Sequence, residues 1–171
     1  MSRFVPRSAV RVAGIGAVAL VLAAACTSCA ASVDHTIKGK IKERAEQVRT
    51  SLEYLGDSPT EDSTEQRIRA GELYTDLALD DAELASDSPL GPPMSVVYDL
   101  STDEQGVVSV SFLIADQSTD SVGLFGSDTR ALVACMTLTA NPDGQIRGSS
   151  AECPDYVDTL YSAYRQVAMK P

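Results

Sequence analysis

Apolar side chains recur with a helical period in the first half of this chain and with a strand period in the second. After residue 34 they return every three or four positions, the spacing that places them on one face of an α-helix. These positions are Ile37, Ile41, Ala45, Val48, Leu52 and Leu55. Ser32 or Asp34 can cap the start of the helix, and Gly56 followed by Pro59 is typical of its end. The pattern therefore predicts an amphipathic helix that ends near Gly56.

A second, shorter helix is predicted over residues 64–79. Ser63 and Gln66 have the spacing of a capping box, in which each side chain accepts a hydrogen bond from the other residue's backbone N–H. The helix would turn four side chains inward, those of Ile68, Leu73, Tyr74 and Leu77. The next segment, residues 80–93, is acidic and then rich in proline and glycine, which is typical of a linker.

From Met94 onward apolar and polar residues alternate, which predicts β-strands. The expected strands are 95–100, 107–114, 131–140 and 145–149. Turn sequences at 103–106 and 141–144 each end on a glycine, which tolerates a positive φ. Residues 116–128 have the composition of a loop, with a short strand at 122–125 at most.

A last helix is predicted from Pro154 to residue 169, because proline suits the first position of a helix. Its inner face would carry Val157, Leu160, Tyr161, Tyr164 and Ala168. The elements together predict one α+β domain over residues 34–171, with two N-terminal helices, an antiparallel sheet of about four strands and a C-terminal helix packed on the sheet. Its parts are a helical region at 34–79, the linker at 80–93, a β-rich region at 94–152 and the helix at 154–169.

The N-terminal segment has the pattern of a secretory signal. Arg3, Arg7 and Arg11 make the first eleven residues basic, with no acid among them. Residues 12–25 then read VAGIGAVALVLAAA, an uncharged apolar run of the kind that follows the basic region of a signal peptide. We expect the body to lie outside the cytoplasm, since the positive flank of such a segment stays inside.

The end of this run, Leu22-Ala23-Ala24-Ala25-Cys26, resembles the lipobox of small bacterial lipoproteins, in which a branched apolar residue and two small residues precede a cysteine. It departs from the pattern in having Ala23 where leucine is usual. The resemblance implies that residues 1–25 are a signal peptide, that Cys26 carries the lipid, palmitate included, and that residues 26–33 are a tether to the cell membrane. The alanine-rich signal and acidic body suit a high-GC Gram-positive organism.

Three other outcomes stay open for the anchor. Cys29 could take the lipid, although the residues before it make a poorer lipobox. A signal peptidase could cut near Ala30-Ala31 and release a secreted protein. The signal could also stay uncleaved, because residues 12–31 are about long enough to span a bilayer. The C-x-x-C spacing of Cys26 and Cys29 also occurs in redox and zinc sites, which need a folded context that the end of a signal lacks.

Cys135 and Cys153 lie outside this segment, and we expect them to form a disulfide. They stand nine residues before and nine residues after Gly144, so a hairpin turning there brings them nearly opposite each other. An even pair of cysteines in an exported protein is expected to oxidise. The bridge would hold the start of the last helix against the sheet.

Charge narrows the range of partners. The chain has 24 acidic and 14 basic residues, a net charge of −10, and removal of residues 1–25 makes it −13. Nucleic-acid binding is not expected, because it needs basic residues that neutralise phosphates. The first body helix is nevertheless net basic, with Lys38, Lys40, Lys42, Arg44 and Arg49 against Glu43, Glu46 and Glu53. This face either contacts anionic lipid headgroups or is a solvated surface paired with the acidic segment downstream.

The sequence contains no catalytic or metal-binding motif that we can assign. His35 is the only histidine and lies beside the expected anchor, a poor place for a Ser-His-Asp hydrolase. We therefore assign no catalytic, cofactor-binding or metal-ligating residue and expect no cofactor. The expected function is a non-catalytic binding or accessory module on the extracytoplasmic face of the membrane, which presents the sheet or residues 116–128 to a protein or small ligand. The alternatives are an extracytoplasmic enzyme that uses carboxylates and a structural envelope protein.

Overall fold

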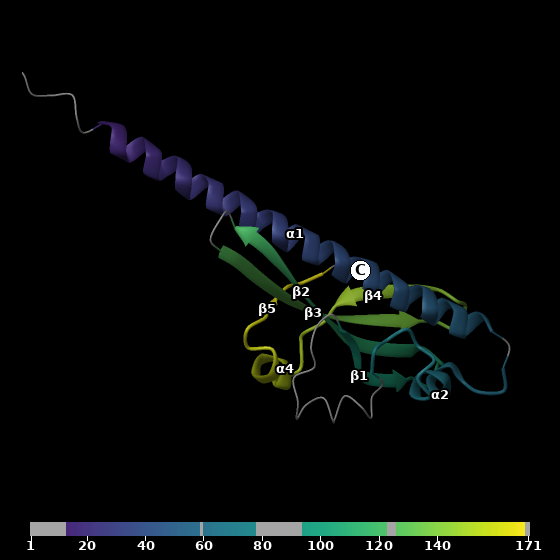
Figure 1. The fold of residues 1–171 in the computed structure, drawn as a ribbon. Coiled ribbons are helices and arrows are strands. Elements are labelled where there is room, and N and C mark those ends of the chain that lie inside the picture. The colour runs from purple at the N-terminus through teal and green to yellow at the C-terminus, as the bar shows by residue number, and fades with distance from the viewer. Residues whose placement is uncertain (1–12, 59, 78–93, 123–125, 170–171) are drawn as a thin grey trace, which may run out of the picture.

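The computed structural model describes the backbone of residues 13–58, 60–77, 94–122 and 126–169, so the predicted linker at 80–93 lies outside the described residues. A long helix lies along one face of a sheet, and a short helix lies on the other face (Figure 1). This is the α+β class that the sequence predicts, with one disulfide.

Four strands form the antiparallel part of the sheet in the order β1-β2-β3-β4. They are β1 (Met94–Thr102), β2 (Val108–Val122), β3 (Gly126–Ala140) and β4 (Ile146–Ser150). The two predicted turns join β1 to β2 and β3 to β4. Gly106 and Gly144 have φ angles of 79° and 81° in these turns, which a residue with a Cβ adopts only at a cost.

Strands β2 and β3 continue past the end of β1 as a two-stranded ribbon, where the sequence predicted a loop at 116–128. Their pairing runs without a break from Val108–Ala140 to Val122–Gly126. The hydroxyls of Thr119 and Thr129 lie 2.9 Å apart across the ribbon. The loop prediction is therefore wrong for both arms, and the expected strand at 122–125 lies mostly outside the described residues.

Helix α1, Ala13–Asp57, is 45 residues long and starts well before the predicted position. Residues 26–33, expected as a tether ahead of the helix, are part of it, and Ser32 and Asp34 lie inside it instead of capping it. The sequence from 26 to 33 holds no glycine or proline, the residues that break helices. The helix start predicted near residue 34 is therefore wrong, and α1 extends beyond the end of the sheet (Figure 1).

The face of α1 that the periodicity predicts is the face that packs on the sheet. Its predicted inward residues are at most 4% exposed: Ile37, Ile41, Ala45, Val48, Leu52 and Leu55. They form one cluster with Phe112 and Ile114 of β2 and with Leu132 and Leu138 of β3. Val33, seven positions after Cys26, is also buried, at 5% exposed.

Helix α2, Thr64–Arg69, carries the predicted capping box. The backbone N–H of Gln66 donates to Ser63 Oγ over 3.2 Å, and the backbone N–H of Ser63 donates to Gln66 Oε1 over 2.8 Å. The helix stops early because Gly71 follows with a φ of 82°, a common way for a helix to end. Its predicted extension to residue 79 is wrong, and Leu77 instead forms a bridge with Val96 of β1.

We expect Ser63→Ala to lower the free energy of unfolding by about 1 kcal/mol, because it leaves the backbone N–H of Gln66 without its acceptor, Ser63 Oγ. Urea unfolding followed by circular dichroism measures the change. Ser63→Gly is the matched control, since glycine at this position costs only a few tenths of a kcal/mol. Equal losses in the two variants would show that the cap contributes nothing of its own.

Helix α4, Asp155–Leu160, also ends earlier than predicted. The chain turns after Leu160, and strand β5, Arg165–Gln166, pairs in parallel with β3 at Leu132 and Val133. The guanidinium of Arg165 forms an ion pair with Asp34 of α1. The pairing with β3 and this ion pair would not form if the helix continued. The predicted helix over 154–169 is therefore wrong beyond residue 160.

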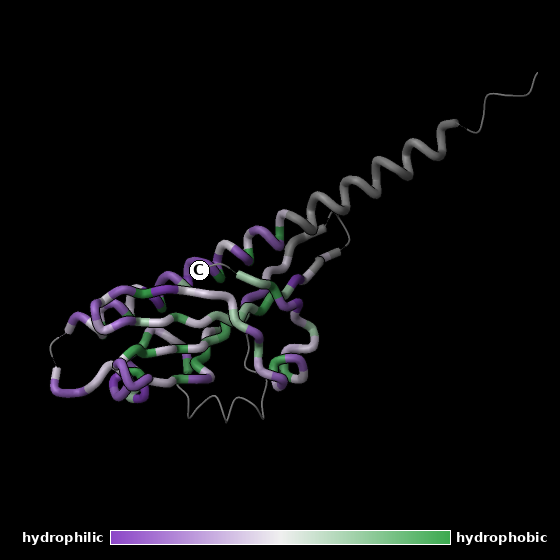
Figure 2. Tube along the Cα trace, turned by 180° about the vertical axis from the view of Figure 1, so that it is seen from behind, coloured by the Kyte–Doolittle hydropathy of each residue, from purple (hydrophilic) through white to green (hydrophobic). Residues whose placement is uncertain are grey.

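The sheet separates two hydrophobic clusters, one under α1 and one under α4. In Figure 2 the hydrophobic colour gathers on the strands, and along the coloured part of α1 hydrophilic and hydrophobic residues follow one another. The cluster under α4 contains Val157 and Tyr161 together with Leu113, Val133 and Cys135. Both faces of the sheet are thus covered, and a single layer of strands supports both halves of the core.

Candidate functional site

A groove runs along the outer side of α1, and we call it the α1 groove. Its larger part has a volume of about 950 Å³ and is lined by α1 residues from Gly39 to Tyr54 and by Tyr74 from the segment after α2. Tyr54 and Tyr74 are the large hydrophobic side chains most exposed among the described residues, at 69% and 60%. Exposed aromatic side chains beside a hollow are typical of binding surfaces.

The groove continues into a polar end of about 540 Å³, which shares Glu43, Gln47 and Tyr74 with the larger part. Asp116 and Gln117 of β2 line this end, opposite Lys40 and Arg44 of α1. Its lining therefore combines charges of both signs at the point where the β2–β3 ribbon leaves the body of the sheet.

Hydrogen bonds fix the segment that carries Tyr74 against α1 and β1. Tyr74 donates its backbone N–H to Ser51 Oγ over 3.1 Å. Arg44 pairs with Asp76 at 3.0 Å, and the same carboxylate accepts hydrogen bonds from the backbone N–H and the hydroxyl of Ser95, at 2.6 and 3.0 Å. The wall of the groove is therefore tied to both the helix and the first strand.

Asp116 is the most unusual side chain of the site. It shares the inward face of β2 with Phe112 and Ile114, and the residue is only 4% exposed. Its carboxylate oxygens are not among the buried side-chain atoms that lack a hydrogen-bond partner, which in the described part of the chain are Asp34 Oδ1 and Tyr156 Oη. Burial, and after it the negative charge of Asp116, raises the pKa of Tyr164, which places this phenol within electrostatic reach of the carboxylate.

The basic residues predicted on the first body helix fall into two groups, ion-paired arginines and exposed lysines. Arg44 and Arg49 are ion-paired, with Asp76 and Glu53 respectively. Lys38, Lys40 and Lys42 are exposed and, among the residues that the structure describes, form no ion pair. Asp76 is not part of the acidic segment at 80–93, so its ion pair with Arg44 does not test pairing with that segment. Whether the basic face contacts lipid headgroups or pairs with residues 80–93 therefore stays a prediction.

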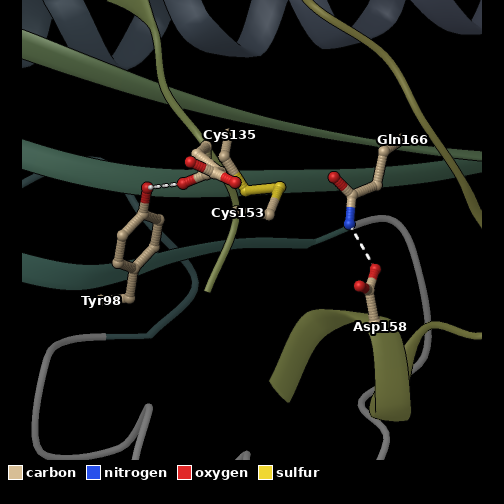
Figure 3. Close-up of a disulfide and its surroundings, with 6 residues drawn as sticks. Tyr98, Cys135, Cys153, Asp158 and Gln166 are labelled. Carbon is tan, nitrogen blue, oxygen red and sulfur yellow. Dashed lines mark hydrogen bonds between the residues drawn. A yellow bond between two sulfur atoms is a disulfide. The ribbon is translucent and has the colours of Figure 1, made fainter. Parts of the chain in front are cut away.

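The Cys135–Cys153 disulfide is present on the α4 side of the sheet, with a Cα–Cα distance of 5.2 Å (Figure 3). Near it, Tyr98 donates its hydroxyl to the backbone oxygen of Glu152 over 3.5 Å, and Gln166 Nε2 donates to Asp158 Oδ1 over 2.5 Å (Figure 3). The bridge lies two residues before α4 and holds its start on the sheet, as predicted.

Tyrosines fill the space around α4. Tyr161 donates its hydroxyl to Met94 Sδ over 2.8 Å and stacks edge-on against Tyr164, with ring centroids 5.2 Å apart. Burial, with the neighbouring Tyr164 and Tyr156, raises the pKa of Tyr161 to about 12. These side chains therefore stay protonated at neutral pH and act as packing groups, the role that the sequence favoured for them.

The two other residues that the sequence analysis considered as sites, Cys26 and His35, both belong to α1. The backbone of Cys26 lies in the helix, and His35 is exposed on the helix surface. Among the fully described residues, no helix is both long and apolar enough to cross a membrane. The described residues also contain no cluster of three or more histidine, cysteine or acidic side chains that could hold a metal ion.

No family model, curated protein or solved structure matches this chain. The function therefore has to be inferred from the chemistry of the groove and from the N-terminal segment.

Proposed function

We propose that this protein is a lipid-anchored extracytoplasmic binding module, anchored in the membrane at Cys26 and binding its partner in the α1 groove. The observation that carries the binding role is the groove itself, with about 950 Å³ of open volume and two exposed tyrosines at its rim. Specific binding sites combine apolar surface, which the two tyrosine rings offer here, with polar groups, which the other lining residues supply.

The anchoring part rests on the sequence of residues 1–29, and the length of α1 gives it a geometric consequence. Val33, which is buried against the sheet, follows Cys26 by seven positions. At the rise of an α-helix this is about 10 Å. A lipid on Cys26 would therefore hold the body close to the membrane surface on a stiff support.

Photo-cross-linking in intact cells tests the binding role. We expect benzoylphenylalanine at Tyr54 or Tyr74 to give a discrete cross-linked product, because both side chains are exposed at the rim of the groove. The same group at Thr159, exposed on α4 across the sheet, is the matched control. No product at either tyrosine, or equal products at all three positions, would contradict a partner in the groove.

A further inference from the structure

We propose that Lys38, Lys40 and Lys42 of α1 bind the anionic headgroups of the membrane that holds the anchor, and that this contact tilts α1 toward the bilayer. We call the three side chains the lysine patch. The inference rests on the proposed function, because the anchor at Cys26 brings the patch near the membrane. Two features lead to it, the absence of partners for these cations in the described part of the chain and their position on the helix that follows the anchor.

The fold leaves the charges of the lysine patch without a partner among the described residues. All three side chains are exposed, and none forms an ion pair or a side-chain hydrogen bond there. The two arginines of the same helix differ, since Arg44 pairs with Asp76 and Arg49 with Glu53. The lysines are therefore the cations of α1 that can meet a partner outside the described chain.

The charge around the lysine patch is locally positive. Asp34 lies one turn earlier, but it is paired with Arg165. Glu43 and Glu46 are exposed on the far side of the patch from the anchor, and Lys42 forms an ion pair with neither. The net charge of −13 on the body after residues 1–25 acts weakly here, because salt screens exposed charges more than about 8 Å apart. An anionic surface that approaches from the anchored end of α1 therefore meets three positive charges first.

The anchor places the patch within reach of the membrane if α1 tilts. The helix continues without a break from Cys26 to Asp57. Lys38 and Lys42 follow Cys26 by 12 and 16 positions, which is about 18 and 24 Å at the rise of an α-helix. The attraction of an anionic membrane falls off within a Debye length of its surface, so an upright helix would keep the patch outside it. Tilting lowers the lysines into this layer, and their attraction to the headgroups favours the tilted position.

The side of α1 that carries the patch is open. Ile37 and Ile41 are fully buried against the sheet, whereas residues 38–40 between them are exposed. Gly39 stands between two of the lysines, and a Cβ at this position would meet no atom of another part of the chain within 4 Å. The helix backbone can therefore approach the headgroups here while the lysine side chains extend to either side. Because the α1 groove begins at Gly39, the tilted helix would present it to a partner at the membrane surface.

Tryptophan fluorescence of the full lipidated chain in nanodiscs tests the inference. The chain has no tryptophan of its own, so Gly39→Trp reports on this position alone. Phosphatidylcholine brominated on its acyl chains is the quencher, and the nanodiscs contain it with or without anionic phosphatidylglycerol. We expect phosphatidylglycerol to raise the quenching at least about twofold and high salt to reverse the rise, because the attraction is electrostatic.

Variants of the patch show whether its charge causes the rise. Replacing Lys38, Lys40 and Lys42 together by glutamine in the Gly39→Trp chain should abolish it. Replacing the same three lysines by arginine is the matched control and should keep it, because arginine carries the same charge. Thr159→Trp, at an exposed position of α4 across the sheet, should show no rise.

The inference is overturned if phosphatidylglycerol leaves the quenching unchanged, the result expected if the patch pairs with residues 80–93 instead. It is also overturned if the glutamine variant keeps the rise, or if Thr159→Trp shows an equal one. Any of these results from a protein that stays in the nanodiscs would leave the lipid anchor standing. A protein that does not stay in them would contradict the proposed function, and the inference with it.

Discussion

Replacing Cys135 and Cys153 together by alanine should lower the free energy of unfolding by about 3 kcal/mol, the value expected for a bridge that closes a loop of this length. The two cysteines are 18 residues apart in sequence. Without the bridge the unfolded chain gains conformational entropy, and the start of α4 loses its covalent link to β3. Urea unfolding of the double variant and of wild type gives the difference directly.

Wild type with and without a reducing agent is the matched control for this experiment. Reduction breaks the bridge but keeps both sulfur atoms in the cluster under α4, so it separates the bridge from the packing of the side chains. We expect reduction to reproduce most of the loss. A stability that is unchanged by reduction would show that the bridge does not stabilise the fold.

Replacing Cys26 by serine should abolish lipid labelling, because serine lacks the thiol that accepts the lipid. Cells grown with radiolabelled palmitate would then show no labelled band, and the share of the protein that sediments with membranes should fall. Stable attachment to a bilayer needs more than one acyl chain, so loss of a diacyl anchor releases most of the protein.

Cys29→Ser is the matched control, since it removes the neighbouring cysteine and keeps the lipobox-like sequence. We expect this variant to label and sediment like wild type. Labelling lost in Cys29→Ser and kept in Cys26→Ser would move the anchor to the second cysteine. An unlabelled wild type that still sediments with membranes would favour an uncleaved signal.

Periodicity predicted the parts of the fold that depend on burial. The inward residues of α1 were found because a helix on a sheet buries every third or fourth position, and Ile37 and Ile41 are fully buried. The disulfide followed from a hairpin turn placed midway between two cysteines. The capping box at Ser63 was readable because its hydrogen bonds join residues three apart.

The wrong secondary-structure predictions lie where pairing between segments distant in sequence decides the structure. The polar, glycine-containing sequence of 116–128 looks like a loop, yet each arm is a strand because the other arm pairs with it. The tyrosines after Leu160 keep helical spacing, but the chain leaves the helix to join the edge of β3. No local signal in residues 26–33 shows whether they continue a helix that begins earlier.

The candidate site was only partly within reach of the sequence. Asp116 had a usable signal, because it follows Val110, Phe112 and Ile114 at every second position and so shares their buried face. The position of Tyr74 had none, since the segment after α2 was assigned to a helix, whereas its contact with Ser51 depends on the turn at Gly71. Sequence reasoning therefore gave the helix that lines most of the groove but not the groove itself.

The intact mass of the protein purified from membranes of its own cell tests the central claim most directly. We predict a chain that begins at Cys26, carries a diacylglyceryl group and is two hydrogens lighter than the reduced form because of the Cys135–Cys153 bridge. A chain that begins near residue 31 without lipid, or one that still begins at Met1, would contradict the lipid anchor on which the proposed function depends.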